Sequence, residues 1–157
     1  MPDSMLDDYR RRLLERYRSQ PAAYQERLRR MNGASLQAPI KPGEWSAHQL
    51  IFHVRAVDEQ AYGPRLLRIL GEDRPQLEDY DEAAWMADHY DPSEEAGAIL
   101  DRWQRARYAC ADALESAPPE AWGRAGLHPF YGERTLQWWL ERAVAHGEDH
   151  RRQLEGE

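Results

Sequence analysis

The sequence predicts an all-α fold: a four-helix bundle with a long connection between its second and third helices. Helical periodicity recurs in four segments, and Pro and Gly residues separate these segments. Strand signals, such as alternating β-branched runs flanking an Asn-Gly or Asp-Gly turn, are almost absent. The 157 residues fit a single domain, placed over residues 1–157, that buries a hydrophobic core without disulfides.

The first helix is predicted over residues 4–19, with apolar side chains at spacings of three and four. These side chains are Leu6, Tyr9, Leu13, Leu14 and Tyr17. Pro21 would cost about 3 kcal/mol inside a helix but suits a first turn. We therefore expect a break near Gln20 and a second helical piece over residues 22–31, ended by Asn32-Gly33.

The second helix is predicted to begin after Ser46, which forms a capping box with Gln49. Trp45 precedes this cap and could fold back against the helix. The apolar stripe continues past Gly63-Pro64, where a bend is expected, and Gly71 ends the helix.

Residues 72–92 are predicted to be a long connection with a short helix at residues 81–89. A connection of this length exceeds a usual helix–helix loop, and such segments often border a site. Ser93 is expected to open the third helix, which ends at Pro118-Pro119. Thr135 is expected to cap a final helix that runs to about Leu154.

Composition excludes several classes of protein. The net charge of −7 disfavours binding to nucleic acid or to an anionic membrane. Cys110 is the single cysteine, so a disulfide scaffold and a Cys-rich zinc module are excluded, and its place on an apolar stripe predicts a core residue. No apolar run approaches the ~18 residues of a membrane span, and no signal-peptide core follows the N-terminus. We expect a cytoplasmic protein.

The last helix carries the most informative pattern, because His146 and His150 occupy its inward apolar stripe. Two histidines four residues apart lie on one helix face, at a separation that suits two ligands of one metal ion. Gly147 lies between them and would leave room for a metal or substrate. The alternative is a pair of semi-exposed histidines near a helix C-terminus, where imidazolium suits the helix dipole.

A third histidine, His53, lies on the inward stripe of the second helix, whereas His48 is predicted to be solvated. Facing helices of a bundle build metal sites from inward side chains, so His53, His146 and His150 could form one site. Three protein ligands with an open position are typical of catalytic metal centres. Neutral imidazoles suit Zn, Ni or Fe as the divalent ion.

Several motifs resemble those of the DinB/YfiT-like superfamily. Pro42 to Ala47 followed by His53 is similar to the beginning of its second helix, and Ala145 to Leu154 resembles its closing His-x-x-x-His helix. Residues 67–75, 80–81, 85 and 126–129 are also similar, and the resemblance covers about residues 40–155.

The resemblance implies a four-helix bundle, commonly a homodimer, with a divalent metal held by His53, His146 and His150. It also implies a metal-dependent transferase that uses a low-molecular-weight thiol such as bacillithiol or mycothiol, or a hydrolase. The metal would activate the thiol or water for attack on a small electrophilic substrate. The competing interpretation is a non-catalytic, stress-related bundle whose histidines are vestigial or hold metal structurally.

Four further residues are candidates for orienting a ligand or binding substrate. Gln60 and Gln153 could each accept an imidazole N–H, or could be solvated at the bundle ends. Arg107 faces inward and could bind an anionic substrate group, or pair with a carboxylate. His128 precedes Pro129 and could line the mouth of the site or cap a turn.

Adjacent tryptophans predict a surface patch. Trp138 cannot share the inward direction of Trp139, so one of the two rings faces outward. Together with Phe130 and Tyr131, an outward ring predicts a dimer interface.

Overall fold

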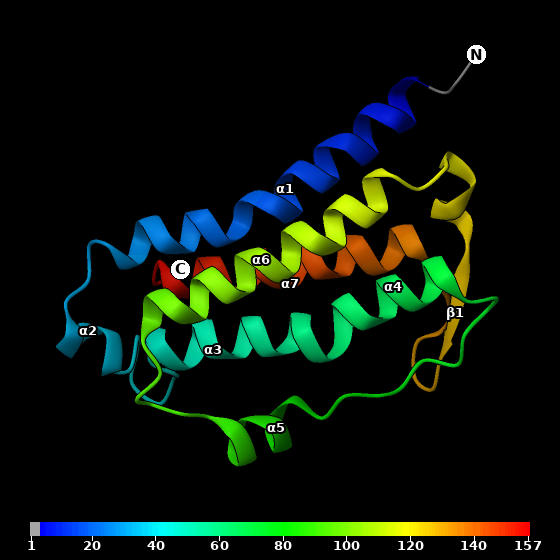
Figure 1. Cartoon of the computed structure of the whole chain (residues 1–157). Coiled ribbons are helices and arrows are strands. Elements are labelled where there is room, and N and C mark those ends of the chain that lie inside the picture. The colour runs from blue at the N-terminus through cyan, green and yellow to red at the C-terminus, as the bar shows by residue number, and fades with distance from the viewer. Residues whose placement is uncertain (1–3) are drawn as a thin grey trace.

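Four long helical segments form a bundle, which confirms the predicted fold class (Figure 1). The computed structural model describes residues 4–157. Residues 1–3 lie outside the described part, and the prediction about a signal peptide falls partly on them. The segments are α1 (Ser4–Leu28), α3 (Ala47–Val57) continued through η1 (Asp58–Tyr62) into α4 (Gly63–Gly71), α6 (Ala96–Glu115) and α7 (Leu136–Leu154). Both α1 and the α3–α4 segment pack against α6 and α7. Within residues 4–157, no helix is both long and apolar enough to cross a bilayer.

The first helix is continuous, so the predicted break near Gln20 is wrong. Pro21 lies inside α1 and has no N–H to donate to the carbonyl of Tyr17, four residues earlier. That carbonyl instead accepts a hydrogen bond of 2.8 Å from Nη1 of Arg107, on α6. Gln20 is buried, and its Nε2 donates to the Val144 carbonyl of α7 at 2.8 Å. These bonds from neighbouring helices hold the proline-containing turn in the helix.

The second segment changes its winding in the middle. Ser46 and Gln49 form the predicted capping box at the start of α3. A π-helical turn, η1, then precedes Gly63-Pro64, where the sequence predicts a bend. The Gly63 amide donates to the Asp58 carbonyl, five residues earlier, and Pro64 lies in the first turn of α4. A π turn adds one residue to the winding and shifts the following side chains around the helix axis.

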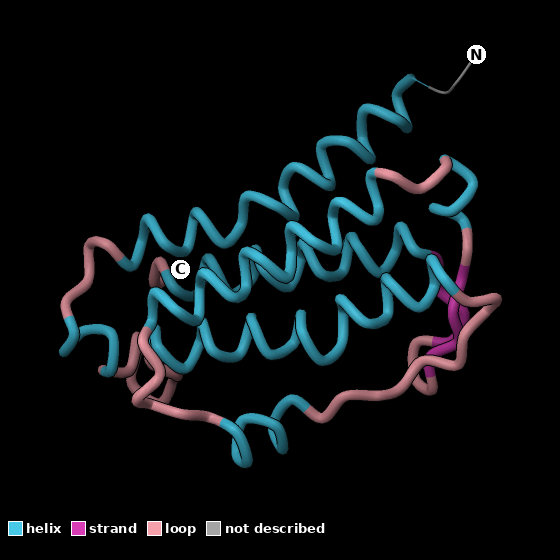
Figure 2. The backbone as a smooth tube through the Cα atoms, viewed as in Figure 1, coloured by secondary structure: helices cyan, strands magenta, loops and turns pink. Residues whose placement is uncertain are grey.

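The connection between α4 and α6 is long, as predicted, and holds the short helix α5 (Glu82–His89), which Figure 2 shows between two stretches of loop. The prediction that Ser93 opens the third helix is wrong, because α6 begins at Ala96. Ser93 instead bonds Asp91 within a turn, and Glu94 pairs with Arg55 of α3. Thr135 caps α7 as predicted, accepting from the Trp138 amide at 3.2 Å.

Two short antiparallel strands were not expected from the sequence: β1 (Ala125–His128) and β2 (Gly132–Thr135). The η2 turn (Pro119–Gly123) leads into them, and the small helix α2 (Gly33–Gln37) completes the elements. Gly126 in β1 lies against the side chains of Leu77 and Ile69, where a Cβ would come within 2.9 Å of Leu77. Close packing holds this strand, together with two backbone bonds: the Leu77 amide donates to the Leu127 carbonyl, and the Leu127 amide donates to the Pro75 carbonyl. The strand therefore forms without the β-branched alternation that marks a strand in sequence.

Candidate metal centre

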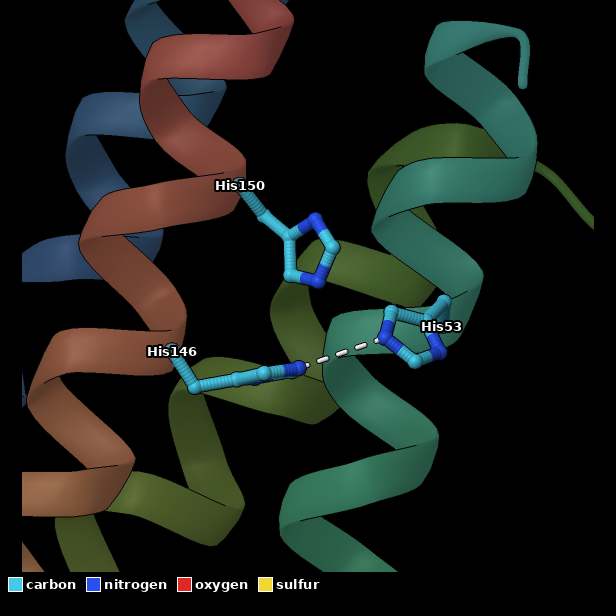
Figure 3. A group of neighbouring side chains, drawn as sticks. All are labelled: His53, His146 and His150. Carbon is cyan, nitrogen blue, oxygen red and sulfur yellow. Dashed lines mark hydrogen bonds between the residues drawn. The ribbon is translucent and has the colours of Figure 1, made fainter. Parts of the chain in front are cut away.

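The three predicted histidines lie together inside the bundle (Figure 3). His53 comes from α3, and His146 and His150 come from successive turns of α7. One ring nitrogen from each lies within 4.8 Å of the other two. His53 is buried at 2% exposure, whereas His146 and His150 are half-buried. The site is therefore anchored in the core on the α3 side and reaches the surface on the α7 side.

Burial keeps two of the three rings neutral. It lowers the pKa of His53 to about 3, with a further contribution from nearby His150. It lowers the pKa of His146 to about 2, assisted by the charges of His150 and His53. Neutral imidazole is the form that binds metal ions, so these rings need to lose no proton to serve as ligands at neutral pH.

Gln153 orients one of the rings. Its Oε1 lies 2.9 Å from Nδ1 of His150, so the imidazole N–H donates to the amide oxygen and leaves Nε2 with a free lone pair. Metal-binding histidines commonly donate their other ring N–H to such an acceptor. Gln60 has no comparable place, because it is exposed on η1 and lines cavities beside α6. The spacing of seven from His53 assumes regular α-helix, and the π turn removes that register.

The geometry of the group fits a divalent ion. The Nε2 atoms of His53 and His146 lie 3.2 Å apart. Two nitrogens bound at 2.0–2.1 Å to a tetrahedral ion are separated by about 3.3 Å. His53 Nδ1 is buried without a hydrogen-bond partner among the described residues. The ring nitrogens that face one another, and the neutral form of the two buried rings, make this donor set suited to a metal.

Three residues that border the triad were not predicted as site residues. Trp45 packs its ring 4.8 Å from that of His53, and Tyr62 lies 5.6 Å from His146, both between ring centroids. Glu82, at the start of α5, places a carboxylate oxygen 3.9 Å from His53 Nε2. Only the path of the long connection brings Glu82 to the site, and periodicity cannot predict that path.

A cavity of about 500 Å³ opens beside the triad, with His146 in its wall. Its other walls come from α4, η1, α7, the hairpin turn and the long connection. The side chains that matter below are Tyr62, Arg65, Asp79, Tyr131 and Arg142. The triad is thus connected to a space that can hold a small molecule.

The remaining candidates lie away from the triad. Arg107 is 1% exposed and donates to Asp58 at 2.6 Å, which corresponds to the carboxylate-paired alternative. His128 lies in β1 and accepts the amides of Phe130 and Tyr131 at Nδ1, so it caps the hairpin turn. Gly147 does not leave room for a metal, since Gln20 and Arg107 occupy that space.

The prediction that His48 is solvated is wrong. It is 2% exposed, and its ring nitrogens lie 2.7 Å from the Tyr90 hydroxyl and 2.6 Å from the Glu94 carbonyl. The end of the long connection covers this face of α3, which helical periodicity alone marks as an outer face. His48 is therefore a satisfied core histidine remote from the triad.

Cys110 is buried as predicted, at 3% exposure. Burial raises the pKa of its thiol to about 11. The thiolate is the nucleophilic form of cysteine, so this side chain is suited to packing and not to attack on a substrate.

Comparisons with known proteins agree with this fold. The chain resembles YfiT from Bacillus subtilis, described as a probable metal-dependent hydrolase with an unusual four-helix bundle topology, with a TM-score of 0.80 and 22% identity over 89% of this chain and 80% of that one. It also resembles TT2238, described as a four-helix bundle protein, with a TM-score of 0.65 and 24% identity over 93% of this chain and 98% of that one. No curated protein matches it. The model of the DinB superfamily matches residues 16–154, and the chain therefore belongs to that superfamily.

Proposed function

We propose that this protein is a divalent-metal-dependent enzyme that binds one ion, Zn, Ni or Fe, through His53, His146 and His150. The observation that supports this proposal is the convergence of three ring nitrogens within 4.8 Å, two of them on imidazoles that burial keeps neutral. YfiT, which shares the fold, is described as a probable metal-dependent hydrolase. The cavity next to His146 favours an enzyme over a purely structural metal site, which would be closed.

The chemistry follows from the surroundings of the triad. A divalent ion acts as a Lewis acid and makes water or a thiol a stronger nucleophile near neutral pH. Gln153 fixes the orientation of His150, and the Trp45 ring packs against the ring of His53. The Glu82 carboxylate lies beside His53 and can accept a hydrogen bond from the O–H or S–H group of the nucleophile. We propose that the nucleophile is water or a low-molecular-weight thiol and that it attacks a small electrophile in the cavity.

Metal analysis tests the site directly. Protein purified without an affinity tag should contain about one divalent ion per chain, and His150→Ala should reduce this content at least tenfold. His89→Ala is the matched control, because His89 is exposed and stacks on Trp85 at 3.8 Å between ring centroids, outside the triad. Equal metal contents in the wild type and His150→Ala would contradict the proposal.

Activity assays separate the two nucleophiles. Metal-loaded protein is given a panel of activated esters, amides and alkyl halides, with and without bacillithiol, mycothiol or cysteine. Product formation that requires the thiol indicates an S-transferase, whereas formation in water alone indicates a hydrolase. Metal binding without turnover of any electrophile would favour the non-catalytic, stress-related alternative.

A further inference from the structure

Two arginines line the cavity beside the triad, one on each of its helical walls. Arg65 lies on α4, three residues after Tyr62, and its guanidinium carbon is 4.7 Å from the centre of the Trp139 ring. Arg142 lies on α7, one turn before His146, and donates to the Tyr131 hydroxyl at 3.1 Å. Aromatic side chains therefore hold both cations in the wall that also contains His146, the triad residue that lines the cavity.

Among residues 4–157, neither arginine is paired with an acid. In the described part of the chain, no carboxylate oxygen lies within 4.0 Å of either guanidinium, although the protein carries a net charge of −7. Arg65 is 9% exposed, and its Nε is buried without an acceptor. Its one hydrogen bond among the described residues runs from Nη2 to the Glu78 carbonyl at 3.2 Å. A buried cation with free donors is costly unless an anion completes its environment.

The acids around the cavity are directed to other partners. Asp81 accepts the Ala84 amide as the N-cap of α5, and Glu82 lies next to His53. Asp79 is 3.7 Å from Nε2 of His128. Since Nδ1 of His128 accepts two backbone amides, its proton lies on Nε2, near this carboxylate but beyond hydrogen-bond distance. The three acids reduce the local charge without forming ion pairs to the arginines.

We propose that Arg65 and Arg142 bind the carboxylate of a small monoanionic substrate and hold its reactive part against Tyr62 and His146. This inference rests on the proposed function in one respect, namely that the bound molecule is the substrate. The guanidinium fork matches the geometry of a carboxylate, and an anion between the two arginines relieves their mutual repulsion. Asp79, Asp81 and Glu82 line the same cavity as the two arginines, so the charged side chains of its wall sum to a formal −1, which opposes a phosphate dianion more strongly than a monoanion.

Binding to the metal-free protein tests this assignment. The full chain, treated with a chelator, is titrated with 3-phenylpropionate and with its neutral isostere 3-phenylpropionamide, and chemical shifts of the arginine Nε–H groups are followed by NMR. The carboxylate should bind at least ~10-fold more tightly than the amide, as expected for charge-assisted hydrogen bonds. Arg142→Gln and Arg65→Gln should each remove about this factor. Arg142 is exposed, so its replacement leaves the folded core intact.

Arg68→Gln is the matched control. Arg68 lies one turn after Arg65 on the same helix but is paired with Glu72 at 2.8 Å, so this change should leave the affinity within about twofold. Equal binding of acid and amide, no binding of either, or an unaffected Arg142→Gln would overturn the proposal. Tighter binding of inorganic phosphate than of the carboxylate would overturn the assignment of a monoanion.

The two proposals fail separately. The titration uses protein stripped of metal, so its outcome does not depend on the metal centre. Carboxylate binding by a chain that holds no ion as purified supports the anion site and contradicts the metal centre. A chain that holds about one ion but does not distinguish acid from amide supports the metal centre and contradicts the anion site.

Discussion

Gly147 lies where α1 and α7 approach each other closely. A Cβ built on it would lie 2.3 Å from Oε1 of Gln20 and 3.2 Å from Nη2 of Arg107. Its carbonyl also accepts the Tyr24 hydroxyl at 2.6 Å. The glycine between the two α7 histidines therefore allows α1 to come close to α7 behind the triad.

Gly147→Ala should destabilise the protein. Alanine gains about 1 kcal/mol of helix propensity, but the added methyl group must displace Gln20 from its bonds, and overpacking of this kind costs about 1–3 kcal/mol. Since Gln20 is held by both Val144 and Arg107, we expect a net loss of about 1–2 kcal/mol in urea unfolding. Gly71→Ala, where no atom lies within 4 Å of the built Cβ, should be neutral or stabilising. A Gly147→Ala protein as stable as Gly71→Ala would contradict the close approach.

The buried acids Cys110, Tyr17 and Tyr24 predict a loss of stability at alkaline pH. Burial raises all three pKa values, that of Cys110 from 9.0 to about 11. In the unfolded chain these groups lose their protons at lower pH than in the native state, so the free energy of unfolding falls as pH rises above about 9. For Cys110 the loss reaches up to about 3 kcal/mol by pH 11.

Urea unfolding at pH 8, 9, 10 and 11 measures this dependence. Cys110→Ala should flatten the part of the decline between pH 9 and 11 relative to the wild type. Identical slopes in the two proteins would show that the thiol is not protected in the folded state.

At the site, residue periodicity identified the triad but not its neighbours. His53, His146 and His150 were predictable because all three replace aliphatic residues on inward helical stripes. His48 and Glu82 were not, since their environments depend on where the long connection packs. Gln60 was predicted near His53 on the assumption of regular α-helix, and the π turn changes its direction. No local motif before Gly63-Pro64 predicts that turn.

Among the elements, α1, η1, α6 and α7 meet at one buried ion pair. Arg107 of α6 binds Asp58 of η1, the carbonyls of Tyr17 and Ala143, and the side chain of Gln20. Trp103 also donates to the Asp58 carboxylate. One guanidinium thus joins all four helical segments and supplies the donor that Pro21 cannot.

Arg107→Leu should be among the most destabilising single changes in the bundle. It leaves the Asp58 carboxylate buried without its cation and the Tyr17 carbonyl without a donor, a situation that costs about 3–5 kcal/mol. Arg102→Leu removes the partner of Glu59 from an exposed position on the same helix and should cost at most about 1 kcal/mol. Chemical unfolding compares the two variants, and similar losses would contradict a central role for the Arg107 pair.

Element boundaries were predictable where a local cap decides them. Ser46 with Gln49, and Thr135, mark the starts of α3 and α7 in the sequence and in the structure. Tertiary contacts decided the others: Pro21 remains inside α1, α6 starts after Ser93, and the hairpin forms around Gly126. In each of these places, a bond or contact from a distant segment outweighs local propensity.

For the whole molecule, we propose that two copies associate through the aromatic patch formed by Phe130, Tyr131 and Trp138. Phe130 is 78% exposed, and the Tyr131 and Trp138 rings lie 5.5 Å apart between centroids. Sedimentation equilibrium at micromolar concentration should give the dimer mass, and Phe130→Asp should shift the protein toward monomer. Tyr108→Asp, which changes an exposed aromatic residue on α6, should leave the mass unchanged. A monomeric wild type would contradict this interface.

The π turn η1 also divides one continuous helical segment into two parts that carry different candidate residues. Upstream of it, α3 carries His53; downstream, α4 carries Arg65 in the wall of the neighbouring hollow. Deleting one residue from η1 would restore uninterrupted winding and rotate the downstream half by about 100° relative to the upstream half. The Arg65 guanidinium would move away from the cavity while His53 kept its place, so the proposed anion site and the proposed metal site can be altered independently at η1.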